Sequence, residues 1–513
     1  MRNPAASLLL ILLIAPLSVA AEPRTFSITD HGGRADGKTL NTDAIADTIA
    51  DAVRAGGGTV VVPRGEWLCG SIELKSNVTL QLDDGAILRM SAEPGDYPVI
   101  RTRWEGIECY NYAGLIFARD AVNVAIIGKG VVDGQGPAWW RWAKSAGAAQ
   151  RRLWELAASG ADVKDRIFGS AKDALRPNLI QFIRCRNVQL EGVTVKDSPM
   201  WAIHPLECDG VVCRDLYVHG LGPNTDGIDP ESCRNVTIEH CTFDCGDDCI
   251  AIKSGRDADG RRTNVPTDGV TIRDCTMRRG HAGVAIGSEM SAGVGNVTVT
   301  RCTMEGTDRG IRIKTMRGRG GAVQDVRIAE LKMTDIVEAA IDIDMEYNRT
   351  TTRPTADATT PAFRNVSITD ITCTGGKRAA IIRGLLESPI DGLTIRRAKI
   401  RADKGITAEY AANVKLIDVE ITAKSGPSIE ADRAAGWMLD QFEARRPPRF
   451  GPLLVFHDPE GLTIKDTTAP DRTHIFLQLT GGKTSNVRLI DCDTSKARER
   501  LDLVDDVPAD AVE

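Results

Sequence analysis

The stretch NVTIEHCTF, residues 235–243, is one copy of a motif that recurs along most of the chain. Each copy begins with Asn, Gly or Asp and continues with alternating apolar and polar residues rich in Val, Ile and Thr. This alternation is typical of a half-buried β-strand, and the first residue suits a left-handed turn. Ten further copies begin at residues 187, 210, 269, 296, 325, 365, 392, 413, 461 and 486.

The spacing of the copies indicates a repeat architecture. Successive starts differ by 23, 25, 34, 27, 29, 40, 27, 21, 48 and 25 residues, which indicates a period of about two dozen with insertions and one skipped coil. One unit cannot bury its apolar face alone, whereas stacked units share a continuous core. The sequence therefore predicts an all-β fold, a right-handed parallel β-helix.

The sixth residue after each start is expected to form an inward-facing ladder. Four cysteines stand at this position, Cys241, Cys275, Cys302 and Cys492. The thirteen cysteines are odd in number and show no paired CxxC spacing. We therefore interpret these four as small buried hydrophobic residues rather than metal ligands or disulfide partners.

The N-terminal residues have the features of an export signal. Residues 1–21 contain one Arg, an apolar run from Leu8 to Leu17 and small residues at the end, which predicts a signal peptide. The remaining sequence has no apolar run long enough to cross a bilayer. We expect a protein without a membrane span that is exported to the periplasm or the extracellular space.

The rest of the chain divides into a cap and a solenoid. Residues 22–115 are expected to form the N-terminal cap and first coils, and residues 116–513 the β-helix domain that carries the site. Residues 138–176, rich in Trp, predict a helical insertion, and residues 426–451 a loop excursion. The formal charge of −6 is mild, with Lys and Arg dispersed, so nucleic acid is excluded as a partner.

The tripeptide Asn41-Thr42-Asp43 precedes an amphipathic segment that ends in a glycine run. This pattern predicts a helix that closes the open end of the solenoid, with Asn41 or Thr42 as its N-cap. Acidic Asp43 is favourable in the first turn. A cap of this kind is expected to tolerate other capping residues.

A second copy of the tripeptide, Asn224-Thr225-Asp226, lies among strands instead. Ionisable residues follow the start of four successive copies by 12–18 residues, namely Asp226, Asp247, Asp248, His281, Arg312 and Lys314. Equivalent positions in neighbouring coils stack about 4.8 Å apart. The sequence therefore predicts that these side chains form a row on one face.

No hydrophobic core requires such a row. A lone Asp or His in a turn usually makes local hydrogen bonds, but the adjacent Asp247 and Asp248 repel each other unless one is protonated or both are bound. Crowded carboxylates raise one pKa into the range where it can donate a proton. Arg312 and Lys314, two residues apart, are suited to hold the carboxylate of an acidic sugar.

Four motifs carry a resemblance to a known family. NTD (224–226), GDDCIAIKSG (246–255), RRGHAGVAIGSE (278–289) and RIK (312–314) stand in the order found in glycoside hydrolase family 28, the polygalacturonases and their relatives. The resemblance implies hydrolysis of α-1,4-galacturonosidic bonds in acidic pectic polysaccharide or oligogalacturonides, with inversion and without a metal or cofactor. We expect the protein to act as a monomer.

The resemblance also implies roles for individual residues. Asp247 is similar to the general acid that protonates the glycosidic oxygen, and Asp226 and Asp248 to the pair that activates the attacking water. His281 is similar to the histidine that tunes the acid. Carboxylates one coil apart lie nearer the separation of retaining enzymes, so the expectation of inversion comes from the resemblance.

Arg312 and Lys314 resemble the pair that grips galacturonate beside the cleaved bond, and Asn224 is grouped with them as substrate-binding. The chain has Ala282 where the family commonly has Gly. An insertion at 254–264, together with the one at 138–176, resembles bacterial members that close one end of the cleft. This favours exo action.

Three alternatives stay open from the sequence. The first is a rhamnogalacturonan-type hydrolase of the same family, although His281 and the RIK motif favour a homogalacturonan-type substrate. The second is a pectate lyase that holds calcium at Asp226, Asp229, Asp247 and Asp248. The third is a non-catalytic β-helix that binds polysaccharide.

Overall fold

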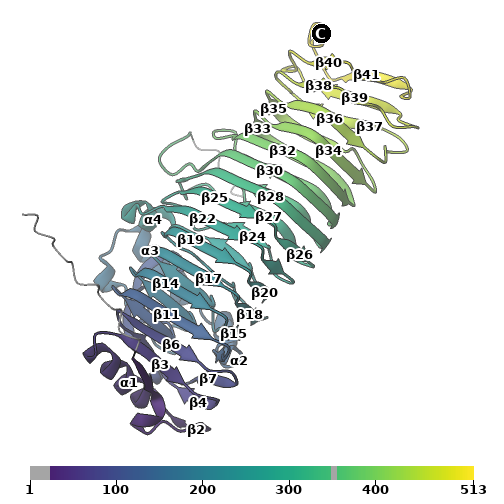
Figure 1. The fold of residues 1–513 in the computed structure, drawn as a ribbon. Helices are drawn as coiled ribbons and strands as arrows, with labels where there is room; N and C mark the ends of the chain where they lie inside the picture. The colour runs from purple at the N-terminus through teal and green to yellow at the C-terminus, as the bar shows by residue number, and fades with distance from the viewer. Residues whose placement is uncertain (1–23, 348–354) are drawn as a thin grey trace, which may run out of the picture.

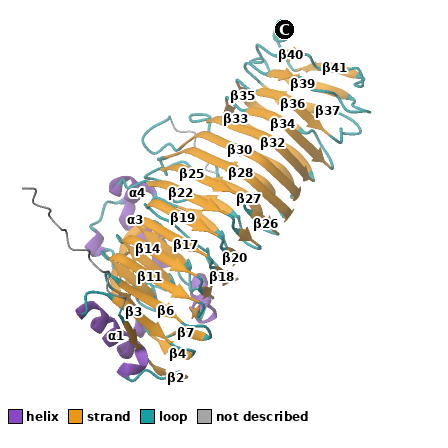
Figure 2. Cartoon of the chain, in the orientation of Figure 1, coloured by secondary structure: helices purple, strands orange, loops and turns teal. Residues whose placement is uncertain are grey.

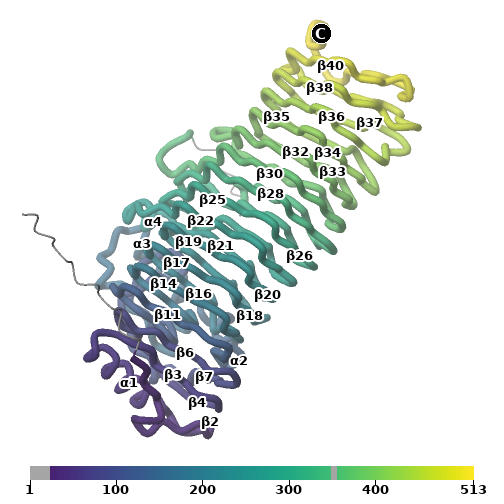
Figure 3. Tube along the Cα trace, in the orientation of Figure 1, coloured from purple at the N-terminus to yellow at the C-terminus, as the bar shows by residue number. Residues whose placement is uncertain are grey.

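The computed structural model describes residues 24–347 and 355–513, which form a long parallel β-helix (Figures 1 and 2). The chain winds coil by coil along the rod, so the first coils and the C-terminus lie at opposite ends (Figure 3). The signal peptide predicted at 1–21 lies outside the described residues. No helix in the described ranges has the length and apolar character that a membrane crossing needs.

Most coils contribute strands to three stacks, in each of which strands of neighbouring coils pair in parallel. The first stack runs through β1 (Thr25–Ser27), β3 (Gly58–Val62), β6 (Val78–Leu82), β11 (Val122–Gly128), β14 (Arg186–Glu191), β17 (Asp209–Arg214), β19 (Arg234–Glu239), β22 (Thr267–Arg273), β25 (Val294–Thr300), β28 (Ala322–Ile336), β30 (Ala362–Gly375), β32 (Ile390–Ala402), β34 (Lys415–Ala423), β36 (Met438–Ala444), β38 (Thr463–Lys465) and β40 (Arg488–Ile490). The second stack joins the first at β28 and comprises β2 (Asp36–Leu40), β4 (Gly65–Cys69), β7 (Ala86–Met90), β12 (Val131–Asp133), β15 (Thr194–Lys196), β18 (Tyr217–Gly220), β20 (Thr242–Cys245), β23 (Thr276–Met277) and β26 (Thr303–Glu305).

The third stack carries the site. It comprises β5 (Ile72–Leu74), β10 (Ile116–Arg119), β13 (Ile180–Ile183), β16 (Ile203–Leu206), β21 (Ile250–Ile252), β24 (Val284–Ile286), β27 (Arg309–Lys314), β29 (Ala339–Asp344), β31 (Arg378–Arg383), β33 (Lys404–Ala412), β35 (Ile429–Ala435), β37 (Pro452–His457), β39 (Ile475–Thr480) and β41 (Glu499–Val504). Bridges at Ile228 and Glu231 fill the step between β16 and β21. An antiparallel hairpin, β8 (Val99–Trp104) and β9 (Ile107–Tyr112), stands outside these stacks.

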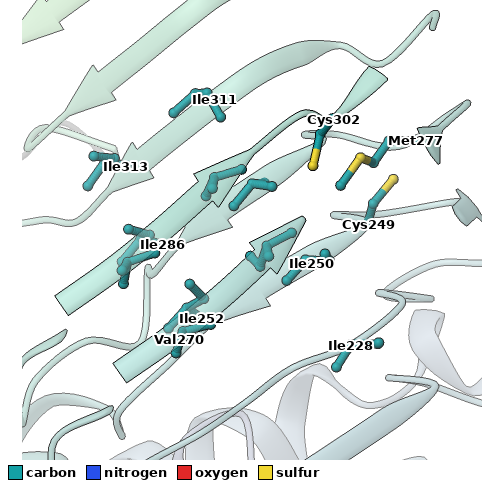
Figure 4. Close-up of a cluster of buried hydrophobic side chains, with 14 of the residues drawn as sticks. Ile228, Cys249, Ile250, Ile252, Val270, Met277, Ile286, Cys302, Ile311 and Ile313 are labelled. Carbon is teal, nitrogen blue, oxygen red and sulfur yellow. The ribbon is translucent and has the colours of Figure 1, made fainter. Parts of the chain in front are cut away.

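The local chemistry of the repeat behaves as predicted. The first residue of each copy adopts a positive φ, for example +54° at Asn235 and +75° at Gly210, which Asn and Gly tolerate. Inward-facing residues then stack in register, as Ile252, Ile286 and Ile313 do in Figure 4. The apolar core is therefore continuous along the rod.

The cysteine interpretation agrees with the structure. All thirteen cysteines are free, and Cys241, Cys275 and Cys302 are buried on the inward ladder. Cys492 is half-buried, because it lies near the C-terminal end of the rod. Burial raises the pKa of the Cys373 and Cys492 thiols, which makes these two inert packing residues.

Helix α1 (Thr42–Arg54) covers the N-terminal end of the rod, with Ile45, Ile49 and Ala52 buried (Figure 1). Asn41 occupies the N-cap position, but the expectation that its side chain caps the helix is wrong. Its amide is buried, accepts from Arg34 N–H at 2.7 Å and donates to the carbonyls of Arg34, Thr39 and Leu68. This residue joins the entering loop to the first coils, so it is not exchangeable for any capping residue.

One predicted insertion is helical and the other is not an insertion. Residues 138–176 contain parts of α2 (Gly136–Trp140) and all of α3 (Gly147–Ala158). Residues 426–451 instead contain β35, the last strand of one coil, and β36, the first strand of an additional coil, so the prediction of a loop excursion is wrong. The coil begins at Gly436 and pairs Leu416 with Leu439, which divides the 48-residue step into 23 and 25. Trp437 at the usual Val position obscured this copy.

Candidate active site

Strands of the third stack keep the same register from coil to coil. This register brings residues from four coils to one cavity of about 330 Å³. Ile228, Ile250, Val284 and Ile311 are successive partners in this stack. The loops before these residues carry the predicted acids and histidine. The cavity lies on the outward side of the stack, opposite the apolar core.

Three carboxylates meet in this cavity. Oxygen atoms of Asp226, Asp247 and Asp248 lie within 4.8 Å of one another. Asp226 is 3% exposed and Asp248 is 1% exposed. Charges so close together and so well buried cannot all be unpaired anions, because burial and mutual repulsion both disfavour the ionised form.

Asp248 is the carboxylate held by cations. Lys314 Nζ lies 2.7 Å from its Oδ2, and Arg312 Nη1 lies 4.0 Å from its Oδ1. The ring of Tyr347 lies against both cations, 5.1 Å from the guanidinium carbon and 5.4 Å from the ammonium nitrogen. Burial disfavours the charged form of Lys314, but the negative charge of Asp248 and further favourable interactions together raise its pKa.

Asp247 forms a pair with the histidine of the next coil. His281 Nδ1 lies 2.9 Å from Asp247 Oδ1, and the two side chains are 50% and 18% exposed. The hydrogen bond to Asp247 raises the pKa of the His281 imidazole. Burial would raise the pKa of the Asp247 carboxyl, but the hydrogen bond and charge of His281 outweigh it and the pKa is lowered.

Asp226 faces the opposite electrostatic situation. Burial, together with the charges of Asp229 and Asp247, raises its pKa well above the ordinary value. Burial likewise raises the pKa of Asp229 to about 8. Among the described residues, the nearest cation to both is Lys253, with Nζ 3.9 Å from Asp226 and 3.4 Å from Asp229.

The loop that carries Asp226 is fixed by its two neighbours in the chain. Thr225 Oγ1 donates to the carbonyls of Gly220 and Gly222, each at 2.7 Å, and accepts from Gly246 N–H at 3.2 Å. Asn224 lines the cavity with a φ of +57°, and its Oδ1 accepts from Arg176 at 2.6 Å. These bonds hold the loop against the coil that carries Asp247.

The six ionisable residues meet as predicted, but they do not form a single row. Counted from the paired isoleucines, Asp226 and Asp248 share one position, and Asp247 and His281 share the position before it. Arg312 is paired with Ala285, the residue after Val284. It therefore lies three residues beyond the position that Asp226 and Asp248 share. Counting from the start of each copy missed this difference, because the connecting loops have different lengths.

For the same reason Lys253 was not predicted as a site residue, and Asp229 was considered only as a calcium ligand of the lyase alternative. Lys253 shares the position of Lys314, and Asp229 that of Arg312. Both side chains are buried in the site. The motif containing Lys253 was visible in the sequence, and its register relative to Ile250 would have indicated its place.

Three residues of the cavity lining, Glu105, Trp154 and Arg256, form a group that we call the wall. Glu105 lies in the turn between β8 and β9, and Trp154 lies in α3. Arg256 is the residue that precedes α4 (Asp257–Thr263). Arg256 Nη1 lies 3.2 Å from Glu105 Oε2, and its guanidinium lies 4.1 Å from the Trp154 ring. Gln150 donates to Glu105 at 2.9 Å. Side chains from three segments distant in sequence are thus linked together.

A model of glycosyl hydrolases family 28 matches residues 58–425, which include the whole site. The chain belongs to this family. The chain is 30% identical over 428 residues to a probable polygalacturonase of Vitis vinifera, a match that covers 80% of this chain and 79% of the relative. An endo-polygalacturonase of Pectobacterium carotovorum is 29% identical over 412 residues, covering 77% of this chain and 94% of the relative.

A solved structure extends the comparison. The crystal structure of a hyperthermoactive exopolygalacturonase from Thermotoga maritima is 35% identical, with a TM-score of 0.72, and the match covers 82% of this chain and 93% of that chain. The present chain, as a member of family 28, is a glycoside hydrolase with the right-handed parallel β-helix that its repeat predicted. The relatives include both exo- and endo-acting enzymes.

Proposed function

We propose that the protein hydrolyses α-1,4-galacturonosidic bonds in pectic polysaccharide and oligogalacturonides, from a chain end and with inversion. One observation carries the proposal: Lys314 and Arg312 lie at the three-carboxylate cluster, with Lys314 2.7 Å from Asp248. An acid cluster alone suits many sugars, whereas cations at the same point suit a uronate. The names of the relatives, polygalacturonases from a plant and from bacteria, support the same substrate class.

Asp247 is proposed as the general acid. It is the most exposed of the three carboxylates, so a glycosidic oxygen can reach it, and His281 is its hydrogen-bond partner. The pKa of His281 is raised and that of Asp247 is lowered, so the proton that the pair shares lies mainly on the imidazole. A bound substrate excludes water and brings further negative charge, which favours moving that proton to the carboxyl.

Asp226 and Asp248 are proposed to activate the attacking water. A base acts best when its pKa lies near the working pH, and Asp226 has the raised pKa that this requires. Asp248, paired with Lys314, supplies a second acceptor for the water. The separation of at most 4.8 Å between the carboxylate oxygens is short for inversion, so stereochemistry needs a direct measurement.

Exo action is supported by the wall of Glu105, Trp154 and Arg256. A chain that passed through the cavity toward the N-terminal coils would meet this linked group. In the other direction the third stack continues through Asp344, Arg383 and Glu409, which are successive partners of Lys314. One end of the substrate therefore has room to extend along the rod, and the other end does not.

The central test measures reducing sugar released from polygalacturonate. We expect Asp247→Asn to lower kcat by about 10²–10⁴-fold, since a positioned general acid contributes this much. Asp274→Asn is the control, because Asp274 lies outside the cavity and pairs with the exposed Arg301. An unchanged rate in the Asp247 variant would exclude the assigned role, and an inactive wild-type enzyme on every pectic polymer would leave a non-catalytic binding protein.

The finer parts of the proposal have separate readouts. Product chromatography over time distinguishes exo action, which releases only a monomer or dimer early, from endo action, which produces a ladder of oligomers. Proton NMR of the first product determines whether the anomeric configuration is inverted. Parallel assays on rhamnogalacturonan identify the related hydrolase activity if that polymer is preferred.

A lyase is the alternative that the carboxylate cluster itself suggests, because three acidic groups within 4.8 Å suit a calcium ion. Lys314 already supplies a positive charge at Asp248, which favours the hydrolase. Ultraviolet-absorbing unsaturated products that vanish with a chelator would identify a lyase.

Export to the periplasm or extracellular space is proposed from residues 1–21, and cell fractionation tests it.

A further inference from the structure

Lys253 is a buried cation in the site to which the roles above assign nothing. It follows β21, and its backbone is bridged to Glu231 of the preceding coil. The side chain is 4% exposed, and Nζ lies 4.5 Å from the centre of the Trp201 ring. A buried ammonium is costly unless anions surround it, so its partners indicate what it does.

Three carboxylates face this ammonium. Nζ lies 3.4 Å from Glu289 Oε2, 3.4 Å from Asp229 Oδ1 and 3.9 Å from Asp226 Oδ2. Only the Glu289 contact is a hydrogen bond, since neither oxygen of Asp229 has a hydrogen-bond partner. Glu289 therefore anchors the ammonium, and the two aspartates share its charge.

Glu289 has two further cations close to it besides Lys253. Arg319 Nη2 lies 3.6 Å and Arg256 Nη1 4.0 Å from its other oxygen, which also accepts from Ser288 at 2.9 Å. Burial raises the pKa of Glu289, and the nearby cations, Lys253 first, lower it well below the ordinary value. Glu289 is thus a fixed anion that holds the ammonium in place.

Asp226 depends on Lys253 much more. The groups with the largest effect on the charge of Asp226 are Asp229, Asp247, Lys253 and Asp248, and among these four Lys253 alone favours the ionised form. Arg176 is a further cation that interacts with Asp226. A base for the attacking water must be ionised before it can take a proton. Removal of Lys253 would leave Asp226 buried among three like charges.

We propose that Lys253 is a positioning residue for the reaction: its ammonium, anchored by Glu289 and shared with Asp229, favours the ionised form of Asp226 that activates water. The role rests on the proposed hydrolase function, but it adds a residue outside the acid, base and uronate-binding groups. Lys253 acts through Asp226 and not by touching the sugar.

The test is the pH profile of kcat/KM on polygalacturonate in wild type, Lys253→Met and Lys253→Arg. Loss of the cation makes Asp226 harder to ionise, so in Lys253→Met the acid limb moves to higher pH by at least about one unit, with tenfold lower activity on that limb. KM is expected to change less than about threefold, because no sugar contact is lost. Lys253→Arg retains the limb near its wild-type position.

Glu289→Gln provides the opposite shift. It removes an anion that competes for the ammonium, so the acid limb is expected to move to lower pH. Opposite shifts in the two variants cannot arise from loss of folding, and Glu289→Gln keeps the proposal testable if Lys253→Met does not fold.

Two results would overturn the proposal. A uniform loss of kcat with an unmoved acid limb would mean that Lys253 only supports the structure. A raised KM with an unmoved limb would mean that it binds a substrate carboxylate. Failure of the proposed function is distinguishable, because wild type would then release no reducing sugar or would form unsaturated products.

Discussion

The same tripeptide, Asn-Thr-Asp, begins α1 at Asn41 and borders the cavity at Asn224. In the first copy the buried residue is the Asn, and Asp43 is exposed in the first helical turn. In the second copy the Thr and Asp are buried, and Asn224 lines the cavity. Identical residues thus have different tasks, because the neighbouring coils offer them different partners.

The two copies differ most in electrostatics. Asp226 lies among carboxylates from its own coil and the next, whereas Asp43 lies at a helix N-terminus that favours a negative charge. A carboxylate is reactive only where its surroundings hold its pKa away from the ordinary value. Paired substitutions of the two tripeptides therefore test whether their surroundings, and not their residue types, determine what they do.

The largest expected contrast is between Asp226→Asn and Asp43→Asn. Loss of the proposed base should reduce kcat on polygalacturonate by about 10²–10⁴-fold. Asp43→Asn should leave kcat unchanged and alter stability by about 0.5 kcal/mol or less, since an exposed first-turn charge contributes little. Equal activity in the two variants would remove the basis for distinguishing the tripeptides.

The second contrast, between Asn41→Ala and Asn224→Ala, reverses the order. Asn41 makes four hydrogen bonds in a buried position, so its loss should destabilise the fold by about 3 kcal/mol and lower the thermal midpoint. Asn224→Ala removes one acceptor of Arg176, which keeps the carbonyls of Pro199 and Pro223. Its main effect should be a severalfold higher KM, measured on oligogalacturonides.

The third contrast concerns the threonines. Thr225→Val leaves the carbonyls of Gly220 and Gly222 without their buried donor, which should cost about 1–2 kcal/mol and lower activity through the loop. Thr42 accepts one bond, from Gly70 N–H at 2.8 Å, and Thr42→Val should cost about 1 kcal/mol or less. Urea denaturation measures both, and a larger loss for Thr42 would contradict the reading.

The smallest expected effect is the pH dependence of stability at His281. The pKa of its imidazole is raised above 6.5 by Asp247, so the pair stabilises the fold at low pH and this contribution is lost as pH rises through the folded pKa. His281 is half exposed, so the contribution should be below about 1 kcal/mol. His281→Asn should remove this dependence together with the alkaline limb of kcat/KM, whereas Asp43→Asn should change neither.

Much of the fold could be predicted because the repeat depends on local chemistry. A turn residue that tolerates positive φ and a period-two strand identify each coil, as at Asn235 and Gly210. The prediction failed where a side chain departed from the pattern: Trp437 stands in place of Val at the second position of a coil, and the segment around it was taken for a loop. The prediction that the Asn41 side chain caps α1 failed because that side chain donates a hydrogen bond to the carbonyl of Leu68, and no local rule predicts this contact.

The acids, His281, Arg312 and Lys314 could be located from spacing because a solenoid converts sequence distance into stacking. The roles of Lys253 and Glu289 could not be assigned from spacing, because these roles depend on which charged atoms face the two side chains. The wall of Glu105, Trp154 and Arg256 was also out of reach, because it joins three segments that share no repeat position.

By itself, the sequence determined the β-helix, its inward ladder and the ionisable residues that meet on one face. These follow from turn preferences and a two-residue strand period, which act over short distances in the chain. Only the tertiary structure decided which carboxylates are crowded, that Lys253 opposes Asp229 and Asp226, and where the cavity ends. Burial and charge at a point depend on every segment that reaches it, and loop lengths between coils set which segments do.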